Sequence, residues 1–222
     1  MNSMSYAELF KAAVNELRKR NIKFALAGGL VASLYRDQPR TTNDIDFLIL
    51  ADSNSQQAAC DLIKAMGLVP HVATRAQLEG GPMFAIKSGR SPVLVVVGRR
   101  EKDRDAPGLD FILPTMPWFE AAFERAQHNT RNFGFGDLPC LCKEDLILAK
   151  MYSLANDNSR LHDLSDLRSI FKEQTNIDLN YLSDQMERLK LTLPASFANE
   201  APALLKKVDK RLRRNARKEA RP

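Results

Sequence analysis

The sequence predicts an α/β fold, with a small mixed sheet and flanking helices followed by a helical C-terminal part. Short apolar runs bounded by turn residues are typical of buried strands, and they occur in the first half of the chain up to Leu113. After Pro114 and Pro117 the apolar residues recur at helical spacing instead. We therefore expect a sheet-containing core at residues 1–115, a helical domain at 116–200 and a basic helix or tail at 201–222.

Composition limits the class of protein. The 222 residues are 44% hydrophobic and 27% charged, which is typical of a globular protein with a sizeable core. No apolar run approaches the length of a membrane span, and the N-terminal segment lacks the apolar stretch of a secretion signal. The three cysteines lack metal-ligand spacing, so we expect reduced thiols in a cytoplasmic protein without a membrane partner. The net charge of +6 suits an anionic partner such as nucleic acid.

The first elements lead to a glycine turn. Ser5 is a suitable N-cap for a first helix. The apolar run 24–27 then predicts a buried strand, and Gly28 and Gly29 follow at once. Because residues 30–35 have helical spacing, the glycines are expected at a helix N-terminus, where free N–H groups and the helix dipole favour phosphate.

A pair of acids begins the next predicted strand. Asp44 and Asp46 open the apolar run 44–50, and alternate residues of a strand point to the same face. Two carboxylates on one face repel each other, and a divalent cation such as Mg²⁺, which takes carboxylate and phosphate oxygens, relieves that repulsion. The sequence thus predicts a magnesium site beside a phosphate-binding turn. The alternative is an ordinary α/β turn followed by a strand with surface acids.

This stretch resembles the nucleotidyltransferase superfamily, in which a Gly-Gly or Gly-Ser turn opens a helix and an Asp-x-Asp strand follows. Arg40 and Thr41, with the acids after them, also resemble the R-x-S/T-x-D-h-D pattern (h is apolar) of the AbiEii-type branch. The resemblance implies Mg²⁺-dependent transfer of a nucleoside monophosphate from an NTP, with release of pyrophosphate. The implied roles are metal binding by the two acids and triphosphate binding by the two glycines, Arg40 and Thr41.

A third carboxylate is expected from a later strand. The segments before it predict a helix at 56–66, no clear pattern at 68–78, strands at 83–86 and 93–97, and an exposed charged segment at 98–107. Asp110 then stands at the head of the apolar run 109–113. By resemblance, Asp110 would complete a two-metal site or act as the base toward the attacking hydroxyl. The alternative is an acid at the exposed entrance of a strand.

The chain from 142 to 170 resembles the second AbiEii-type signature, a helix with E-D-L-x-x-x-K and a following helix with R-x-x-D-x-x-D-L. The matching residues are Lys150, Arg160, Asp163 and Asp166. By resemblance, Lys150 would bind the triphosphate, Asp163 would orient Lys150 or accept a proton from the acceptor, and Asp166 would support nucleotide binding. Asp163 and Asp166 share a helix face, so an interhelical ion pair with Lys150 is the structural alternative.

The last segment is strongly basic. Residues 204–221 carry nine Lys or Arg side chains against two acids. Leucine and valine recur at helical spacing in its first half, so this half is expected to dock while the second half contacts RNA phosphates. A solvated terminal helix is the alternative.

The resemblance also implies partners. AbiEii-type proteins include toxins of toxin–antitoxin pairs that modify RNA, including tRNA ends, so we expect an RNA acceptor and an antitoxin protein. One alternative is a nucleotidyltransferase that acts on a small molecule such as an antibiotic. The other is a non-catalytic nucleotide- or RNA-binding module with the same fold.

Overall fold

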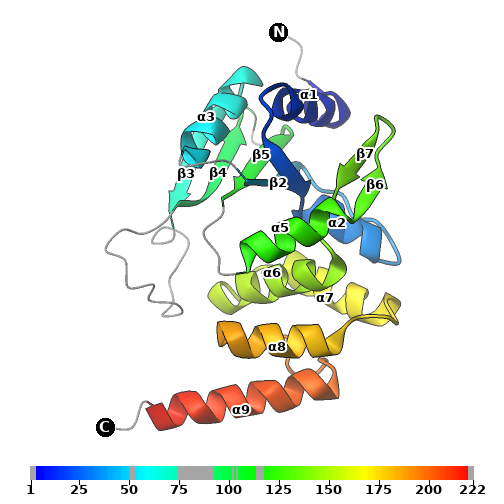
Figure 1. Ribbon diagram of the computed structural model, residues 1–222, viewed down its shortest axis with the longest axis vertical. Helices are drawn as coiled ribbons and strands as arrows, with labels where there is room; N and C mark the ends of the chain where they lie inside the picture. Colours follow the sequence, from blue (N-terminus) through cyan, green and yellow to red (C-terminus); the bar gives the residue numbers. More distant parts are fainter. Residues whose placement is uncertain are drawn as a thin grey trace. The chain divides into compact units, whose positions relative to one another are not determined.

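The computed structural model describes residues 4–50, 54–74, 93–101, 103, 105–113 and 118–219. Their contacts divide the chain into two compact units, whose elements are labelled in Figure 1. The first unit holds the sheet and ends at Cys142, and the second holds Tyr35–Gln38 and the helices from Lys143 onward. The domain boundaries expected at residues 115 and 200 stay predictions, whereas compactness places the division after residue 142.

The first unit is built on a sheet with the strand order β1-β2-β5-β4-β3. Its strands are β1 (Lys23–Leu26), β2 (Asp44–Leu50), β3 (Val69–Thr74), β4 (Val93–Arg99) and β5 (Gly108–Ile112). β2 and β5 are parallel, and the other three pairs are antiparallel. This mixed sheet confirms the predicted fold class, and it makes neighbours of the strand that carries Asp44 and Asp46 and the strand that carries Asp110.

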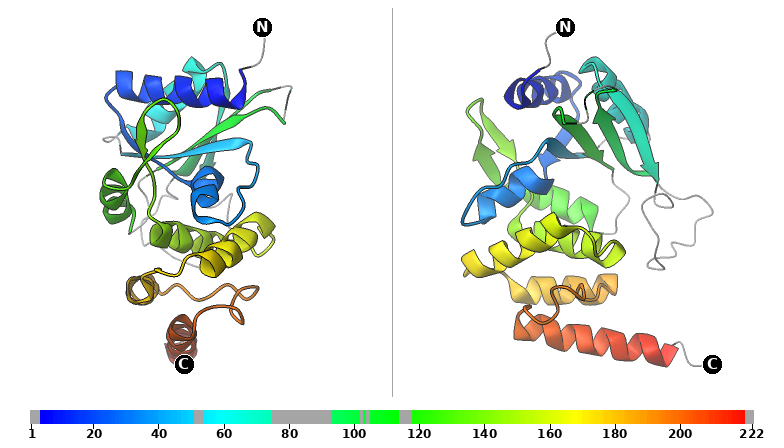
Figure 2. Two further views of the ribbon diagram at one scale, coloured as in Figure 1. Left: turned by 90° about the vertical axis from the view of Figure 1, so that its right-hand side faces the viewer. Right: turned by 180° about the vertical axis from the view of Figure 1, so that it is seen from behind.

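Helices cover both faces of this sheet. They are α1 (Tyr6–Lys19), α2 (Gly28–Tyr35), α3 (Ser55–Ala65) and α5 (Phe119–Gln127), and a hairpin of β6 (Thr130–Asn132) and β7 (Asp137–Pro139) follows. Figures 1 and 2 show α1 and α3 together on one face of the sheet and α2 on the other. Ser5 caps α1 as predicted, because its hydroxyl accepts the Glu8 N–H at 3.4 Å while the Glu8 carboxylate accepts the Ser5 N–H at 2.8 Å.

Alternation along β2 decides which face carries the core. Phe47 is fully buried, and its ring lies 5.5 Å from that of Phe111 on β5 and 6.2 Å from that of Phe10 on α1. Full burial of an apolar side chain of this size contributes about 1.5–3 kcal/mol. A register shift of one residue would expose this row, so the core packing fixes Asp44 and Asp46 on the opposite face.

The second unit is a set of helices. These are α6 (Lys143–Asn156), α7 (Leu161–Glu173), α8 (Leu179–Leu189) and α9 (Ala203–Glu219). α6 packs against α7 and α8, and α8 packs against α9. The predicted docking half of α9 is confirmed, because Leu205 and Val208 are buried.

The segment between α8 and α9 is packed against the helices. Phe197 is buried, and its ring lies 5.3 Å from that of Phe171. Asp209 of α9 accepts the Leu193 N–H at 2.8 Å, which satisfies a buried backbone donor. The start of α9 is therefore tied to the preceding chain by a polar contact as well as by apolar burial.

β3 is an element that the sequence pattern did not show. It contains Pro70, which cannot donate to a ladder and therefore weakens a strand prediction. The sheet order places β3 at an edge, where a strand tolerates proline. The strand expected at 83–86 lies outside the described residues.

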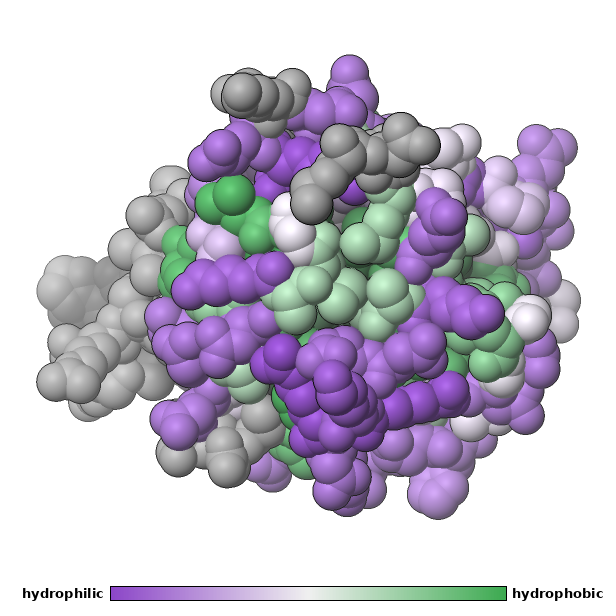
Figure 3. All heavy atoms as spheres, turned by 90° about the horizontal axis from the view of Figure 1, so that it is seen from above, coloured by the Kyte–Doolittle hydropathy of each residue, from purple (hydrophilic) through white to green (hydrophobic). Residues whose placement is uncertain are grey.

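Few large apolar side chains remain on the described surface. Figure 3 shows hydrophilic residues around a paler, mildly hydrophobic area on the face seen from above. Among the residues with described burial, the large hydrophobic side chains that are exposed are Leu34 and Leu161. Across the described ranges, no helix combines the length and the apolar character that crossing a membrane requires.

Candidate active site

The turn between β1 and α2 has the conformation expected from its glycines. Gly28 has a φ of +60°, which glycine adopts without side-chain strain, and α2 begins at this residue. A Cβ atom at Gly28 would lie 1.8 Å from Asp46 Oδ2. The Asp46 carboxylate therefore lies directly against the N-terminal end of α2, where the helix dipole stabilises negative charge.

The loop before β2 brings a guanidinium and a hydroxyl to this turn. A Cβ atom at Gly29 would lie 2.8 Å from Arg40 Nη2 and 3.0 Å from Thr42 Oγ1. The Arg40 guanidinium also donates to the Thr41 carbonyl at 3.2 Å, and Thr41 is exposed. Thr42 was not predicted as a site residue, although it stands at the S/T position of the R-x-S/T-x-D-h-D pattern; its hydroxyl faces the turn and donates to the Asp44 carbonyl at 3.2 Å.

Three aspartates gather on the sheet face opposite the Phe47 core. Asp44 and Asp46 alternate with buried residues of β2, so their predicted common face is confirmed. Asp110 is the register partner of Asp46 on the parallel strand β5. Paired residues of neighbouring strands point to the same face, so Asp110 joins the other two. The Asp44 and Asp110 side chains are 39% and 17% exposed, which leaves the group open to solvent.

Arg99, at the end of β4, lies between two of these carboxylates. Its Nη1 donates to Asp110 Oδ1 at 2.6 Å, and its Nη2 lies 3.3 Å from Asp110 Oδ2 and 3.1 Å from Asp44 Oδ2. Burial alone would lower the pKa of Arg99, but the hydrogen bond to Asp110 and the aspartate charges raise it overall. The sequence placed Arg99 in an exposed segment, because no local signal shows that β4 pairs with β5.

Tyr6, in the first turn of α1, adds a neutral hydroxyl near the aspartates. This hydroxyl is buried and has no hydrogen-bond partner among the described residues. Burial is the main cause of the raised pKa of Tyr6, and the charges of Asp46 and Asp44 raise it further. The phenol therefore stays protonated. Sequence reasoning missed Tyr6 because a tyrosine in an amphipathic helix carries no distinguishing signal.

The aspartates fit part of what a magnesium site needs. Mg²⁺ is commonly bound by one or two carboxylates together with substrate phosphates and waters, and Asp44 and Asp46 supply two carboxylates on one strand face. In the described part of the chain, no group of three or more His, Cys, Asp or Glu side chains is placed to hold a metal ion. Arg99 lies between Asp44 and Asp110, where a third ligand would have to come from. The residues fit one divalent ion at Asp44 and Asp46 and do not fit a second ion at Asp110.

Lys150 of α6 is the centre of another charge cluster, in the helical unit. Its Nζ lies 2.8 Å from Asp163 Oδ1 and 2.6 Å from Asp166 Oδ2, both on α7. Arg160 Nε lies 2.6 Å from Asp163 Oδ2, and Arg36 Nη1 donates to Asp166 Oδ1 at 2.6 Å. The four residues of the second signature therefore meet, and Arg36 joins them from a loop that gave no signal.

This Lys150 cluster is buried. Lys150 is 4% exposed, Asp163 is 7% exposed and Asp166 is fully buried. Burial alone would raise the pKa of Asp163, but the charge and hydrogen bond of Lys150, with those of Arg160, lower it overall. An interhelical ion pair, the structural alternative, thus has the geometry it requires. A role for Lys150, Asp163 or Asp166 toward the nucleotide stays a prediction.

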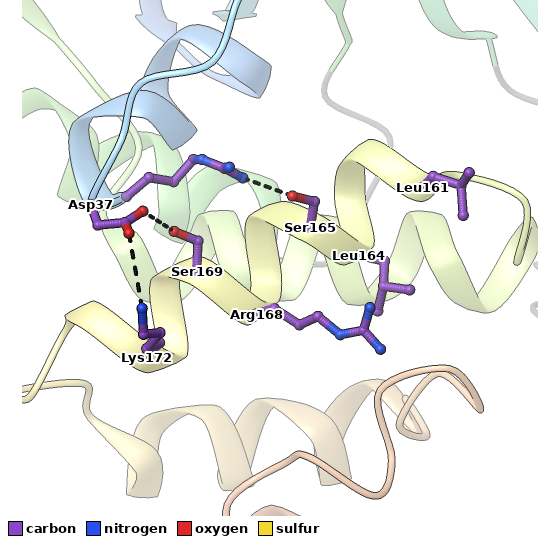
Figure 4. A pocket seen from close by; sticks show the side chains of 8 residues that line it. Asp37, Leu161, Leu164, Ser165, Arg168, Ser169 and Lys172 are labelled. Carbon is purple, nitrogen blue, oxygen red and sulfur yellow. Dashed lines mark hydrogen bonds and ion pairs between the residues drawn. The ribbon is translucent and has the colours of Figure 1, made fainter.

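An open hollow lies on another side of α7. It has a volume of about 430 Å³ and is lined by Arg36, Asp37, Leu161, Leu164, Ser165, Arg168, Ser169 and Lys172. Figure 4 shows Asp37 between two of its neighbours: it accepts the Ser169 hydroxyl at 3.1 Å, and Lys172 Nζ lies 4.0 Å away. Arg168 pairs with Glu200. The lining contains none of the predicted site residues and its cations face acids, so we assign no substrate to this hollow.

Solved structures similar to this chain include nucleotidyltransferases. The antibiotic-resistance factor ANT(2'')-Ia is 12% identical, with 95% of this chain and 93% of that chain covered and a TM-score of 0.43. An antigenic nucleotidyltransferase-like protein from Paracoccidioides brasiliensis is 16% identical, with 96% and 91% covered and a TM-score of 0.44. The lincosamide antibiotic adenylyltransferase LnuA, solved with lincomycin bound, is 19% identical, with 76% and 99% covered and a TM-score of 0.44. At these identities and scores, the likenesses decide nothing about substrate.

A family comparison is decisive for the class of protein. A search of curated protein sequences gave no match. The family model described as "Nucleotidyl transferase AbiEii toxin, Type IV TA system" matches residues 13–221, a range that includes the glycine turn, the three aspartates and the Lys150 cluster. This chain therefore belongs to the AbiEii nucleotidyl transferase family and is a nucleotidyltransferase.

Proposed function

We propose that this nucleotidyltransferase transfers a nucleoside monophosphate from an NTP to RNA, with Mg²⁺ bound at Asp44 and Asp46. The observation that carries the proposal is the pair of carboxylates that β2 presents beside the N-terminal end of α2. In the proposed reaction, an acceptor hydroxyl oxygen forms a bond to the α-phosphorus of the NTP. The bond from that phosphorus to the bridging oxygen breaks, pyrophosphate leaves, and the hydroxyl proton passes to a carboxylate or to water.

The residues around the glycine turn are suited to the triphosphate. The first N–H groups of an α-helix have no partner within the helix, so Gly28 and Gly29 are proposed to donate to phosphate oxygens. Arg40, Thr41 and Thr42 are proposed to add a cation and hydroxyl donors. When bound, Mg²⁺ would supply neutralisation of the phosphate charge. Phosphoryl transfer depends on positioning and charge neutralisation more than on a covalent nucleophile, and these residues offer both.

α9 offers a surface for the RNA acceptor. Five exposed cations on it form no ion pair with a described residue, and we call them the basic stripe: Lys207, Lys210, Arg214, Arg217 and Lys218. Because these positions recur at helical spacing, they form one row about 16 Å long on one side of the helix. Leu205 and Val208 are buried on the docked side. A row of cations without internal partners is suited to RNA phosphates.

The acceptor and the chemistry are tested together. Each labelled NTP is incubated with the protein, Mg²⁺ and total RNA, and the Asp44→Asn and Asp46→Asn variants serve as controls. Label that enters RNA and depends on both aspartates supports the proposal. Transfer to a small molecule such as an antibiotic, with no label in RNA, would reject RNA as the acceptor.

The basic stripe is tested by charge removal. Lys210, Arg214 and Arg217 are replaced together by glutamine, which leaves the docked side and Asp209 intact. RNA affinity should fall, and the slope of log affinity against log salt should become shallower by roughly 2, since each phosphate contact contributes about 0.7–0.9 to the slope. NTP affinity should not change, because the stripe is assigned to the acceptor.

A matched control removes the same charge elsewhere. Lys11, Lys19 and Lys64 are exposed lysines on α1 and α3, and their joint replacement by glutamine should leave RNA affinity unchanged. Equal losses in the two triple variants would show that net charge alone governs RNA binding. Because the family is that of a type IV TA system, an antitoxin protein is also proposed as a partner.

A further inference from the structure

The guanidinium of Arg99 is held from three sides. Nη1 donates to Asp110 Oδ1 at 2.6 Å and to the Gly98 carbonyl at 3.0 Å. Nη2 lies 3.1 Å from Asp44 Oδ2 and 3.3 Å from Asp110 Oδ2. A planar guanidinium that contacts two carboxylates in this way has little freedom to move, so Arg99 is a fixed part of the aspartate cluster.

The first residue of β5 makes room for this arrangement. Gly108 is the register partner of Asp44. A Cβ atom at Gly108 would lie 2.4 Å from Arg99 Nη1 and 2.8 Å from Asp44 Oδ1. Any side chain at this position would therefore displace the guanidinium or the carboxylate. The sequence of β5 thus accommodates Arg99 as well as supplying Asp110.

The position of Arg99 limits where metal ions can bind in the cluster. The three aspartates and Arg99 sum to −2, which attracts a divalent cation. A second divalent ion would have to share Asp110 with the guanidinium, 2.6 Å from Oδ1, where two cations would repel each other.

We propose that Arg99 takes the place of a second metal ion in this site. This inference rests on the proposed Mg²⁺-dependent transfer. One divalent ion binds at Asp44 and Asp46, and Arg99 is the second cation, which is held by Asp110 and neutralises phosphate charge. Asp110 then has the role of holding Arg99, and it is neither a metal ligand nor the base.

The test counts bound metal ions and does not depend on activity. Mn²⁺ replaces Mg²⁺ because free Mn²⁺ can be measured by electron paramagnetic resonance, and the titration includes a non-hydrolysable NTP analogue. Wild-type protein should bind about one Mn²⁺ ion per chain, whereas a two-metal site would bind about two. Arg99→Gln should bind a second ion, because Asp44 and Asp110 lose the cation between them and a divalent ion relieves their repulsion.

Two further variants test whether the number of bound ions depends on the positive charge at residue 99. Arg99→Lys keeps a cation at this place and should stay at one ion. Arg131→Gln removes the same charge from an exposed residue of the β6–β7 hairpin, and it should also stay at one ion. Circular dichroism and thermal melting establish that each variant is folded. If Arg99→Gln fails to fold, the numbers of ions bound by the wild-type and Arg99→Lys proteins still distinguish a one-metal site from a two-metal site.

The outcomes distinguish this inference from the proposed function. Two ions in the wild-type protein, or one ion in folded Arg99→Gln, would overturn the role of Arg99 even if RNA is labelled. One ion in the wild type and two in Arg99→Gln would support it even if the acceptor is not RNA. Wild-type protein that binds no Mn²⁺ with the analogue would reject both this inference and the metal site at Asp44 and Asp46.

Discussion

Replacement of Lys150 by methionine should strongly destabilise the helical unit. Lys150 is 4% exposed, and its Nζ lies 2.8 Å from Asp163 and 2.6 Å from Asp166. Without it, the fully buried Asp166 keeps its ion pair with Arg36, and Asp163 keeps the partly exposed Arg160 as its cation partner among the described residues. Removing one partner of a buried ion pair costs about 3–5 kcal/mol, because the remaining charge stays desolvated.

The expected shift in melting temperature follows from this loss. Methionine keeps most of the volume of lysine, so a cavity contributes little and the change is mainly electrostatic. For a chain of this size each kcal/mol lowers Tm by about 2–4 °C, which gives a fall of about 6–20 °C. The control is Lys172→Met on α7, whose side chain is 75% exposed and lies 4.0 Å from Asp37. An exposed pair of this kind contributes about 0–1 kcal/mol.

The assays are thermal and urea unfolding at neutral pH, both followed by circular dichroism, with NTP affinity measured on the same samples. The sequence signature alone predicts that loss of Lys150 weakens NTP binding and changes stability little. The buried geometry predicts the large loss of stability. A Lys150→Met protein as stable as the Lys172→Met control, with NTP binding lost, would refute the reasoning from burial and restore Lys150 as a triphosphate ligand.

Three further results are expected. Asp44→Asn or Asp46→Asn should abolish nucleotide transfer with an unchanged circular dichroism spectrum, and full activity in either variant would remove the metal-site assignment. Tyr6→Phe should change the free energy of unfolding, measured in urea, by less than about 1 kcal/mol, because the buried hydroxyl has no partner among the described residues to lose, and a larger loss would contradict this. Because folding lowers the pKa of Asp163, its stabilising effect should be present above about pH 4 and be lost as the pH falls further, so urea midpoints of the wild type and Asp163→Asn should converge in acid.

Local patterns predicted most of the fold. The turn from β1 into α2 and the strand that follows were predictable because glycine conformation, helix spacing and strand alternation are properties of neighbouring residues. β3 was not predictable, because Pro70 argues against a strand unless the strand lies at an edge, and only the assembled sheet shows that it does. The helices of the second unit were predictable, because apolar residues recur at helical spacing over long stretches of the sequence.

Within the aspartate cluster, the local pattern predicted Asp44 and Asp46, and the family resemblance predicted Asp110. Asp44 and Asp46 follow from alternation on one strand. Arg99 was placed in an exposed segment, because its meeting with Asp110 depends on the register between β4 and β5. Tyr6 likewise reaches the aspartates through packing of α1 and not through a motif. Long-range pairing, which a single sequence does not show, therefore supplies the cation that lies beside the aspartates.

The charge balance of the two clusters separates their proposed roles. On the sheet, three aspartates and Arg99 leave a charge of −2, and the Asp44 side chain is 39% exposed, so a divalent ion is both attracted and admitted. In the helical unit, three cations against two aspartates leave a charge of +1, which would attract a phosphate. Each of these cations, however, already lies within 2.8 Å of a carboxylate, and freeing Lys150 would leave the buried Asp166 less compensated. We therefore propose that the sheet cluster performs the transfer and that the helical cluster stabilises α6 against α7.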